Sequence, residues 1–180
     1  MDVGALEGKI VVVTGGGSGM GAAFSRRLAA DGAHVVVNDV NEAAAGSVAD
    51  EVSGEAAIFD VADSKSFDAA IDRIVAHHGR IDVLINNAGL ALGRDTFQDA
   101  NLDDWETMID TNVKGLLYVS KAVLPLLIQN KKAHIINIGS TAGVEVYKEG
   151  NVYCASKHAV AAISKSMRID LLPQHIKVTA

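Results

Sequence analysis

The fold of this chain is decided by residues 14–21, Thr14-Gly15-Gly16-Gly17-Ser18-Gly19-Met20-Gly21. This segment follows the apolar run 9–13 (KIVVV), typical of a strand, and precedes the stretch 19–31, typical of a helix. Glycines at such a turn let the backbone approach a pyrophosphate, whose charge is favoured by free N–H groups at a helix N-terminus. Tight strand–helix packing is the alternative reason for the glycines, but the position after a first strand favours a phosphate site.

Outward from this turn, short β-branched runs alternate with longer helical stretches. We expect strands at 9–13, 34–38, 55–59, 81–85, 133–138 and 176–179, and helices at 19–31, 41–52, 64–78, 102–129 and 151–172. Asp63 or Ser64 is the expected N-cap of the third helix, and Pro125 should bend or interrupt the fourth. This alternation predicts an α/β fold, a Rossmann-type doubly wound parallel sheet with helices on both faces, in one domain over 1–180.

The turn does not have the G-x-G-x-x-G spacing, and no Lys-Ser/Thr pair follows it as in a Walker loop. Its pattern, T-G-x-x-x-G-x-G, resembles the cofactor loop of the short-chain dehydrogenase/reductase family. Further matches are the Asp60-Val61 pair after the third strand and Asn86-Asn87-Ala88-Gly89 after the fourth. The resemblance implies that these segments bind a nicotinamide dinucleotide. The implied cofactor-binding residues are Thr14, Gly15, Ser18, Gly19, Met20, Gly21, Asp39, Asp60, Val61, Asn87, Ala88, Gly89, Tyr153 and Lys157.

Asp39 ends the second strand about 20 residues past the glycine turn, where a carboxylate can accept hydrogen bonds from the adenosine ribose hydroxyls. It would also repel a 2′-phosphate, and residues 38–45 contain no Arg or Lys to bind one. NAD is therefore the expected cofactor, in preference to NADP. A role for Asp39 in capping the helix near Asn41 is the secondary interpretation.

Tyr153 and Lys157 are four residues apart on an expected helix, so both side chains lie on one face. A phenol has a pKa near ~10, and a neighbouring ammonium ion favours the phenolate, which would suit the pair to proton transfer. Spacing alone is weak support, because a half-buried tyrosine beside a solvated lysine gives the same pattern. Ser140, at the end of the fifth strand, could donate a hydrogen bond to the substrate oxygen.

The order Asn112, Ser140, Tyr153, Lys157 matches the catalytic set of the same family. The resemblance implies hydride transfer between the nicotinamide and a secondary alcohol or ketone, with Tyr153 exchanging the hydroxyl proton. Lys157 would lower the Tyr153 pKa and bind the nicotinamide ribose, Ser140 would position the substrate oxygen, and Asn112 would hold a water that links Lys157 to solvent. Two alternative functions remain open. One is a non-catalytic nucleotide-binding scaffold, and the other is an epimerase or dehydratase like those of the family's extended relatives.

Composition narrows the classes of partner. The net charge of −6 disfavours a nucleic-acid binder. The basic pair Lys131-Lys132 is better explained as solvated, and the start, MDVGALEGK, lacks a signal-peptide pattern. No apolar run is expected to reach the length of a membrane span, so we expect a cytoplasmic enzyme with a small-molecule alcohol or carbonyl substrate and no membrane or nucleic-acid partner. Cys154 is the single cysteine.

No metal site is expected from the sequence. His77 and His78 precede Gly79 at an expected helix end, where a structural role is favoured by the helix dipole. His134, His158 and His175 have no metal-like spacing to carboxylates.

The likeness to the family is uneven along the chain. Residues 1–89 resemble NAD-linked bacterial members. The sequence from about Asn86 onward resembles the serine and 3-hydroxy acid dehydrogenase branch, as seen in NNAGLALG, HIINIGSTAG and GNVYCASK. One hypothesis for this difference between the two parts is that the chain is joined from two related parent proteins. The simpler explanation is that different faces of the protein surface carry different charges. The chain ends inside the expected sixth strand, so we expect a C-terminally incomplete fold. Homo-oligomers through helices 102–129 and 151–172 are usual in the family.

Overall fold

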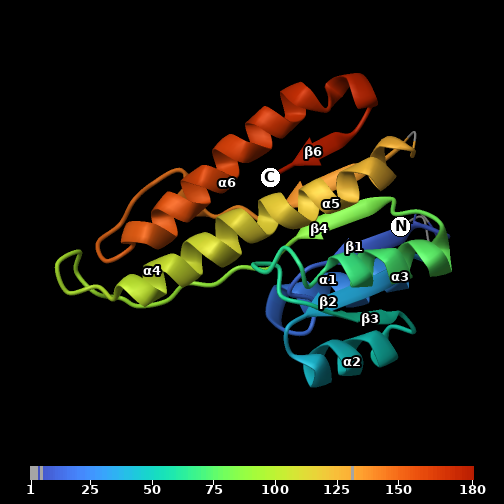
Figure 1. Cartoon of the computed structure of the whole chain (residues 1–180), viewed down its shortest axis with the longest axis horizontal. Coiled ribbons are helices and arrows are strands. Elements are labelled where there is room, and N and C mark those ends of the chain that lie inside the picture. The colour runs from blue at the N-terminus through green and yellow to red at the C-terminus, as the bar shows by residue number, and fades with distance from the viewer. Residues whose placement is uncertain (1–3, 5, 131) are drawn as a thin grey trace.

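The structure, a computed structural model, describes residue 4, residues 6–130 and residues 132–180 (Figure 1). Residues 1–3 and 5 of the start, and Lys131 of the basic pair, lie outside the described residues. The strands are β1 (Ile10–Val13), β2 (His34–Asp39), β3 (Glu55–Ile58), β4 (Val83–Asn86), β5 (His134–Asn137) and β6 (Lys177–Thr179). They pair in parallel in the order β3-β2-β1-β4-β5-β6, which confirms the expected doubly wound sheet.

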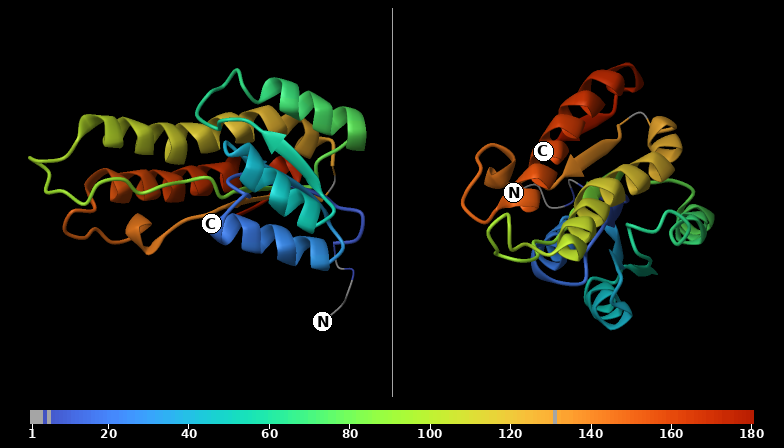
Figure 2. Two further views of the ribbon diagram at one scale, coloured as in Figure 1. Left: turned by 90° about the horizontal axis from the view of Figure 1, so that it is seen from below. Right: turned by 60° about the vertical axis from the view of Figure 1, so that its left-hand side comes forward.

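The helices are α1 (Gly19–Ala30), α2 (Glu42–Glu51), α3 (Asp68–His78), α4 (Leu102–Ile109), α5 (Leu116–Ile128) and α6 (Asn151–Asp170). A π-helical segment, η1 (Asp110–Gly115), joins α4 to α5, and η2 (Thr141–Gly143) and η3 (Leu172–Gln174) are 3₁₀ turns. Figure 2 shows α1 and α2 below the sheet and α3 with the α4–α5 rod above it. Helices therefore cover both faces.

Alternate residues of β1 serve the two halves of the core, because successive side chains of a strand point to opposite faces. Ile10 and Val12 pack with buried residues of α3 and α5, while Val11 and Val13 pack with buried residues of α1 and α2. The unbroken apolar run KIVVV is thus explained by burial on both faces.

Two details of the helices differ from expectation. The third helix starts at Asp68, with Phe67 in the N-cap position, because Asp63 instead closes a tight turn by accepting from the backbone N–H of Lys65 at 2.9 Å. The expected break at Pro125 is wrong: α5 continues through this exposed residue to Ile128. The irregularity of the rod lies earlier, in the π-helical segment.

Within the described residues, the helical run Leu102–Ile128 is 27 residues long and contains an 18-residue window with a mean hydropathy of 1.2. By length and composition alone it could cross a membrane, so the expectation that no run reaches that length is wrong. In this fold one face of the run packs on the sheet, where Val119, Val123 and Leu127 are fully buried.

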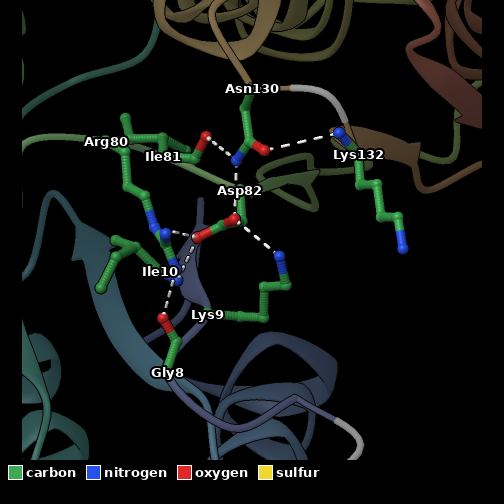
Figure 3. A network of polar contacts seen from close by, with 8 residues as sticks. All are labelled: Gly8, Lys9, Ile10, Arg80, Ile81, Asp82, Asn130 and Lys132. Carbon is green, nitrogen blue, oxygen red and sulfur yellow. Dashed lines mark hydrogen bonds and ion pairs between the residues drawn. The ribbon is translucent and has the colours of Figure 1, made fainter.

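Asp82, just before β4, is a fully buried carboxylate that ties together the end of the sheet where β1 and β4 begin (Figure 3). It accepts from the backbone N–H of Ile10 at 2.9 Å, from Lys9 Nζ at 2.9 Å and from Asn130 Nδ2 at 2.6 Å. The Lys9 and Asn130 bonds are to Oδ1, whereas Ile10 N donates to Oδ2, from which Arg80 Nε lies 3.0 Å away. Burial raises the pKa of Asp82, but the donated hydrogen bonds outweigh burial and hold the pKa below its usual value.

Candidate active site

A cleft of about 510 Å³ opens at the carboxyl ends of β1 to β4. The strand order reverses between β1 and β4, and open α/β sheets bind ligands at such a reversal. Ten of the expected cofactor-binding residues line it: Gly15, Ser18, Gly19, Met20, Asp39, Asp60, Val61, Asn87, Ala88 and Gly89.

At Gly15 and Gly21 the glycine turn lies against the segment after β4, with no room for a side chain. A Cβ on Gly15 would lie 3.0 Å from Ala88 Cα, and one on Gly21 would lie 2.0 Å from Gly15 O. Asn87 Nδ2 donates to both Thr14 O and Gly15 O at 2.9 Å. The close approach that the glycines permit is therefore used between the turn and the segment after β4, which fixes the floor of the cleft.

Thr14 is buried and supports the site from below. Its Oγ1 donates to Ile85 O at 3.3 Å and accepts from the backbone N–H groups of Asn87 at 3.1 Å and Ala88 at 3.0 Å. Thr14 and Gly21 thus do not line the cleft itself, and their contribution is to hold the residues that do.

Asp39 lines the cleft, but both of its carboxylate oxygens have partners within the protein. Oδ2 accepts from Gly17 N at 3.1 Å, and Oδ1 accepts from Asn41 N at 3.1 Å. Asn41, whose side chain accepts from Ala44 N at 3.0 Å, is the N-cap of α2. The carboxylate is therefore part of the loop structure, which accounts for an acidic residue here without any reference to the cofactor ribose.

Sequence reasoning missed several residues that line the cleft: Asn38, Val40, Phe59, Leu90, Thr107 and Thr111. Four of them adjoin predicted site residues at strand ends, so position next to a strand-end motif could have indicated them. Asn38 is buried and donates to Ala57 O at 3.0 Å and Phe59 O at 2.9 Å, linking β2 to β3. Thr111, in η1, adjoins the predicted Asn112, whereas Thr107 comes from α4 and carries no sequence signal of its own.

Lys157 is buried on α6, and burial lowers the pKa of its ammonium group. Its Nζ donates to Ile138 O at 2.9 Å and lies 6.0 Å from the centre of the Tyr153 ring. A Cβ on Gly89 would lie 3.7 Å from the same Nζ. The lysine ammonium group therefore lies close to Gly89, which lines the cleft, and within 6.0 Å of the Tyr153 ring centre.

Asn112 lies in the π-helical segment, and π turns inside helices are frequent at functional sites. Its Oδ1 accepts from Leu90 N at 2.8 Å, and its Nδ2 donates to Leu90 O at 2.8 Å and Ser156 Oγ at 3.1 Å. Both Nδ2 hydrogens are thus used within the protein. The side chain ties η1 both to the segment after β4 and to α6.

Ser140 follows β5, and its Oγ accepts from Ala142 N at 3.1 Å. That bond occupies a lone pair and leaves the hydroxyl hydrogen to point elsewhere. The turn after Ser140 packs closely on α6, since a Cβ on Gly143 would lie 2.6 Å from Lys157 O. Three segments thus carry the four residues: η1 carries Asn112, the turn after β5 carries Ser140, and α6 carries Tyr153 and Lys157.

Tyr153 lines a second, smaller cavity of about 230 Å³. This cavity is also bordered by Arg94, Tyr147 and Lys148. The tyrosine therefore borders a space of small-molecule size, and its ring lies 6.0 Å from Lys157 Nζ.

A parallel sheet in this order, with a glycine turn and a tyrosine–lysine pair at the carboxyl ends of its strands, defines a Rossmann-type oxidoreductase of the nicotinamide-dependent kind. Residues 9–180 match the family model for short chain dehydrogenases. The chain belongs to this family, and it is an oxidoreductase that acts on hydroxy or oxo substrates.

Several relatives support this assignment. The chain is 41% identical over 172 residues to the NADP-dependent 3-hydroxy acid dehydrogenase YdfG of Shigella flexneri, covering 94% of this chain and 69% of that protein. A solved serine dehydrogenase from Escherichia coli superposes with a TM-score of 0.86 at 41% identity, over 90% of this chain and 76% of that one. The resemblance to the serine and 3-hydroxy acid branch is thereby confirmed.

The preference for NAD over NADP, inferred from Asp39, is wrong. The 3-hydroxy acid dehydrogenase is NADP-dependent. A gluconate 5-dehydrogenase from Burkholderia cenocepacia, 34% identical with a TM-score of 0.92 over 98% of this chain and 71% of that one, was solved with NADP. The family uses both dinucleotides. The inference failed because it took the carboxylate as a sign of the cofactor, whereas Asp39 also has a role in the loop, where it accepts from the Gly17 and Asn41 amides.

Proposed function

We propose that the large cleft binds NAD(P) and that Tyr153 exchanges a proton with the oxygen of a secondary alcohol or ketone in the neighbouring cavity. The observation that carries this proposal is that Tyr153 borders the smaller cavity, while Lys157 Nζ, 6.0 Å from the centre of its ring, lies beside Gly89 of the cleft. When bound, the dinucleotide supplies hydride transfer to or from the substrate carbon.

The cleft fits an elongated dinucleotide. Its volume of about 510 Å³ lies within the range of small-molecule sites, and the glycine turn leaves backbone exposed at the start of α1 for a pyrophosphate. Met20 and Val40 are exposed apolar side chains on its wall, suited to contact the flat face of a base. Asp60 and Val61 end the adjacent strand segment on the same side.

The residues of the catalytic set have distinct tasks in this proposal. Ser140 donates its free hydroxyl hydrogen to the substrate oxygen, and Tyr153 removes or supplies the proton on that oxygen. Lys157, oriented by Ile138 O, places a positive charge beside Tyr153 and Gly89. Asn112 uses its side chain to fix the Leu90 segment against α6, so any water it holds must contact its backbone or the remaining lone pair of its Oδ1.

The substrate we propose is a 3-hydroxy acid or the corresponding oxo acid. The cavity beside Tyr153 is bordered by the cationic side chains of Arg94 and Lys148, which suit a carboxylate. The relative named above acts on 3-hydroxy acids, and 41% identity supports a related substrate here.

Replacing Tyr153 by phenylalanine tests the chemistry. The turnover number should fall by at least about 100-fold, because the proton-transfer group is lost, while NAD(P)H binding measured by fluorescence is retained. Tyr118→Phe, on the half-buried face of α5, is the matched control and should keep normal turnover. Near-normal turnover of Tyr153→Phe would refute the role of the tyrosine.

Replacing Arg94 by glutamine tests the substrate class. The KM for a 3-hydroxy acid should rise by roughly 10-fold or more, because a charge-assisted hydrogen bond is lost, whereas the KM for a neutral secondary alcohol stays the same. Arg73→Gln, an exposed position on α3, is the control. Equal KM values in wild type and Arg94→Gln would exclude this carboxylate contact without affecting the chemistry assigned to Tyr153.

We also infer that the enzyme is a cytoplasmic homo-oligomer. A groove of about 560 Å³ between α4 and α6, lined among others by Trp105, Ile109 and Val152, offers an apolar surface to a second copy of this chain. Light scattering on the purified chain tests this inference, and a monomer at micromolar concentration would contradict it.

A further inference from the structure

A cluster of metal-binding residue types lies at the end of the sheet opposite the cofactor cleft. It consists of His34, the first residue of β2, Glu55, the first residue of β3, and His78, the last residue of α3. The cleft lies at the carboxyl ends of the strands, whereas these residues lie at the amino ends. In Figure 1, α3 runs to the right of the molecule, the side on which β1 begins. The cluster is therefore separate from the catalytic site.

The strand pattern explains why His34 and Glu55 share a face. Val36 and Ala57 belong to the buried cluster that packs under α3. His34 is two residues before Val36 and Glu55 is two residues before Ala57, and side chains two apart on a strand point the same way. Val36 is also the register partner of Glu55. Both polar side chains thus continue an apolar stripe at the point where it reaches the edge of the core.

The helix pattern brings His78 over the same point. Ile74 is fully buried against the sheet, and His78 follows it by four residues, so the two lie on one helical face. The last turn of α3 therefore places an imidazole above the first residues of β2 and β3. The three residues are far apart in sequence, but the register of two strands and one helix fixes their meeting.

The donor atoms already lie close together. The possible ligand atoms of His34, Glu55 and His78 are all within 4.8 Å of one another. His78 Nε2 lies 3.0 Å from Glu55 Oε2, and the rings of His34 and His78 have centroids 4.5 Å apart. A tetrahedral Zn²⁺ with bonds of ~2.0–2.1 Å needs ligand atoms about 3.3 Å apart, so small side-chain rotations would complete the geometry.

One atom of the cluster has no partner. His34 Nε2 is buried, and no described residue makes a hydrogen bond to it. Buried polar atoms are nearly always satisfied, so an orphaned imidazole nitrogen calls for an explanation such as a bound ion.

We propose that His34, Glu55 and His78 bind a divalent transition-metal ion of the zinc type, with water or His77 in the fourth position. Two imidazoles and one carboxylate suit Zn²⁺ and similar ions, whereas Mg²⁺ and Ca²⁺ prefer oxygen ligands alone. His77 is the nearest further donor, with Nδ1 3.4 Å from Glu55 Oε2. The ion would join the edge strand β3 to β2 and α3, so its effect is on stability and not on the reaction.

Zinc titration of the full chain, after treatment with a chelator, tests the proposal. We expect about one Zn²⁺ per chain by calorimetry, and a rise in Tm of about 5–10 °C at a zinc concentration near 100 times the Kd, with no rise from Mg²⁺. Glu55→Gln should weaken zinc binding at least about 100-fold, since a charged ligand is lost. Absence of zinc binding by the wild-type chain would overturn the proposal.

His34→Leu distinguishes loss of the site from loss of the fold. Without metal this variant should melt at or above the wild-type Tm, because leucine removes the orphaned nitrogen, yet its Tm should not respond to zinc. His175→Asn, at an exposed left-handed position that asparagine tolerates, is the control and should retain the full response. A zinc response that survives both His34→Leu and Glu55→Gln would place the ion elsewhere and refute this site.

Discussion

Replacing Gly21 by alanine should damage the cofactor site more than any other single methyl group in the glycine turn. The new Cβ would lie 2.0 Å from Gly15 O and 2.6 Å from Asn87 Nδ2. Since a Cβ needs more than 3.0 Å, the backbone of the turn or of α1 must move by about 1 Å or more. Gly15 O and Asn87 Nδ2 are themselves hydrogen-bonded at 2.9 Å, so the movement breaks the contact between the turn and the end of β4.

The size of the effect follows from the hydrogen bonds that a displaced turn cannot make. A bond from a backbone N–H to a charged phosphate contributes about 1.5–3 kcal/mol, and loss of two such bonds costs about 3–6 kcal/mol. That free energy corresponds to a dinucleotide Kd roughly 100- to 10,000-fold weaker. Gly21→Ala should therefore show almost no NAD(P)H binding at concentrations that saturate the wild-type chain.

The assay is a fluorescence titration with NADH and NADPH, combined with circular dichroism to confirm folding. Gly46→Ala is the matched control, because nothing lies within 4 Å of the added Cβ in α2. It should bind dinucleotide normally and gain up to about 1 kcal/mol of stability from helix propensity. A folded Gly21→Ala that binds within about threefold of wild type would show that the tight contact is not needed for the cleft.

Two further predictions concern buried charges. Asp82→Asn should lower the free energy of unfolding by about 3 kcal/mol at pH 7, or roughly 6–12 °C in Tm, because Lys9 and Arg80 lose their buried partner. The pKa of Asp82 is lower in the folded than in the unfolded state, so its contribution to the free energy of unfolding is present above the unfolded pKa and is lost as the pH falls through the folded pKa. The Tm values of the wild type and Asp82→Asn should therefore converge at low pH. A Tm difference that does not change with pH would contradict the direction of the shift. Lys157→Met should abolish turnover yet be at least as stable as wild type at pH 7, because burial disfavours the ammonium. The folded state then binds fewer protons than the unfolded state as the pH rises through the folded-state pKa of Lys157. Wild-type stability should therefore rise relative to the variant over that range, and a falling difference would refute the direction of the shift.

The parallel sheet and most of the cleft could be predicted because they depend on local signals. The strand KIVVV and the glycine turn after it can be recognised within about a dozen residues. Each expected strand lies within a few residues of its predicted position. Strand-end motifs such as Asp60-Val61 and Asn87-Ala88-Gly89 line the cleft because parallel strands all end at the same edge.

The features that escaped prediction depend on contacts between distant segments. Asp82 lies in an apolar strand pattern, and its buried role is visible only when Lys9 and Asn130 are brought beside it. The contact between His34 and His78 likewise depends on how α3 packs on β2. Asp39 shows the opposite error, since a motif-based role was assigned to a carboxylate that the fold occupies with two amides.

The π-helical segment Asp110–Gly115, which joins α4 to α5, changes the rotation of α5 about the helix axis relative to α4. A wide turn holds one residue more than an α-helical turn, and one residue rotates everything beyond it by about 100°. The two ends of the rod can therefore satisfy different neighbours: Val119 and Val123 face the sheet, while Trp105 donates from its Nε1 to Asn151 Oδ1 on α6 at 3.1 Å. Deletion of one residue in this segment would give a more regular helix, in which α5 could not pack on the sheet while Trp105 of α4 keeps its contact with α6.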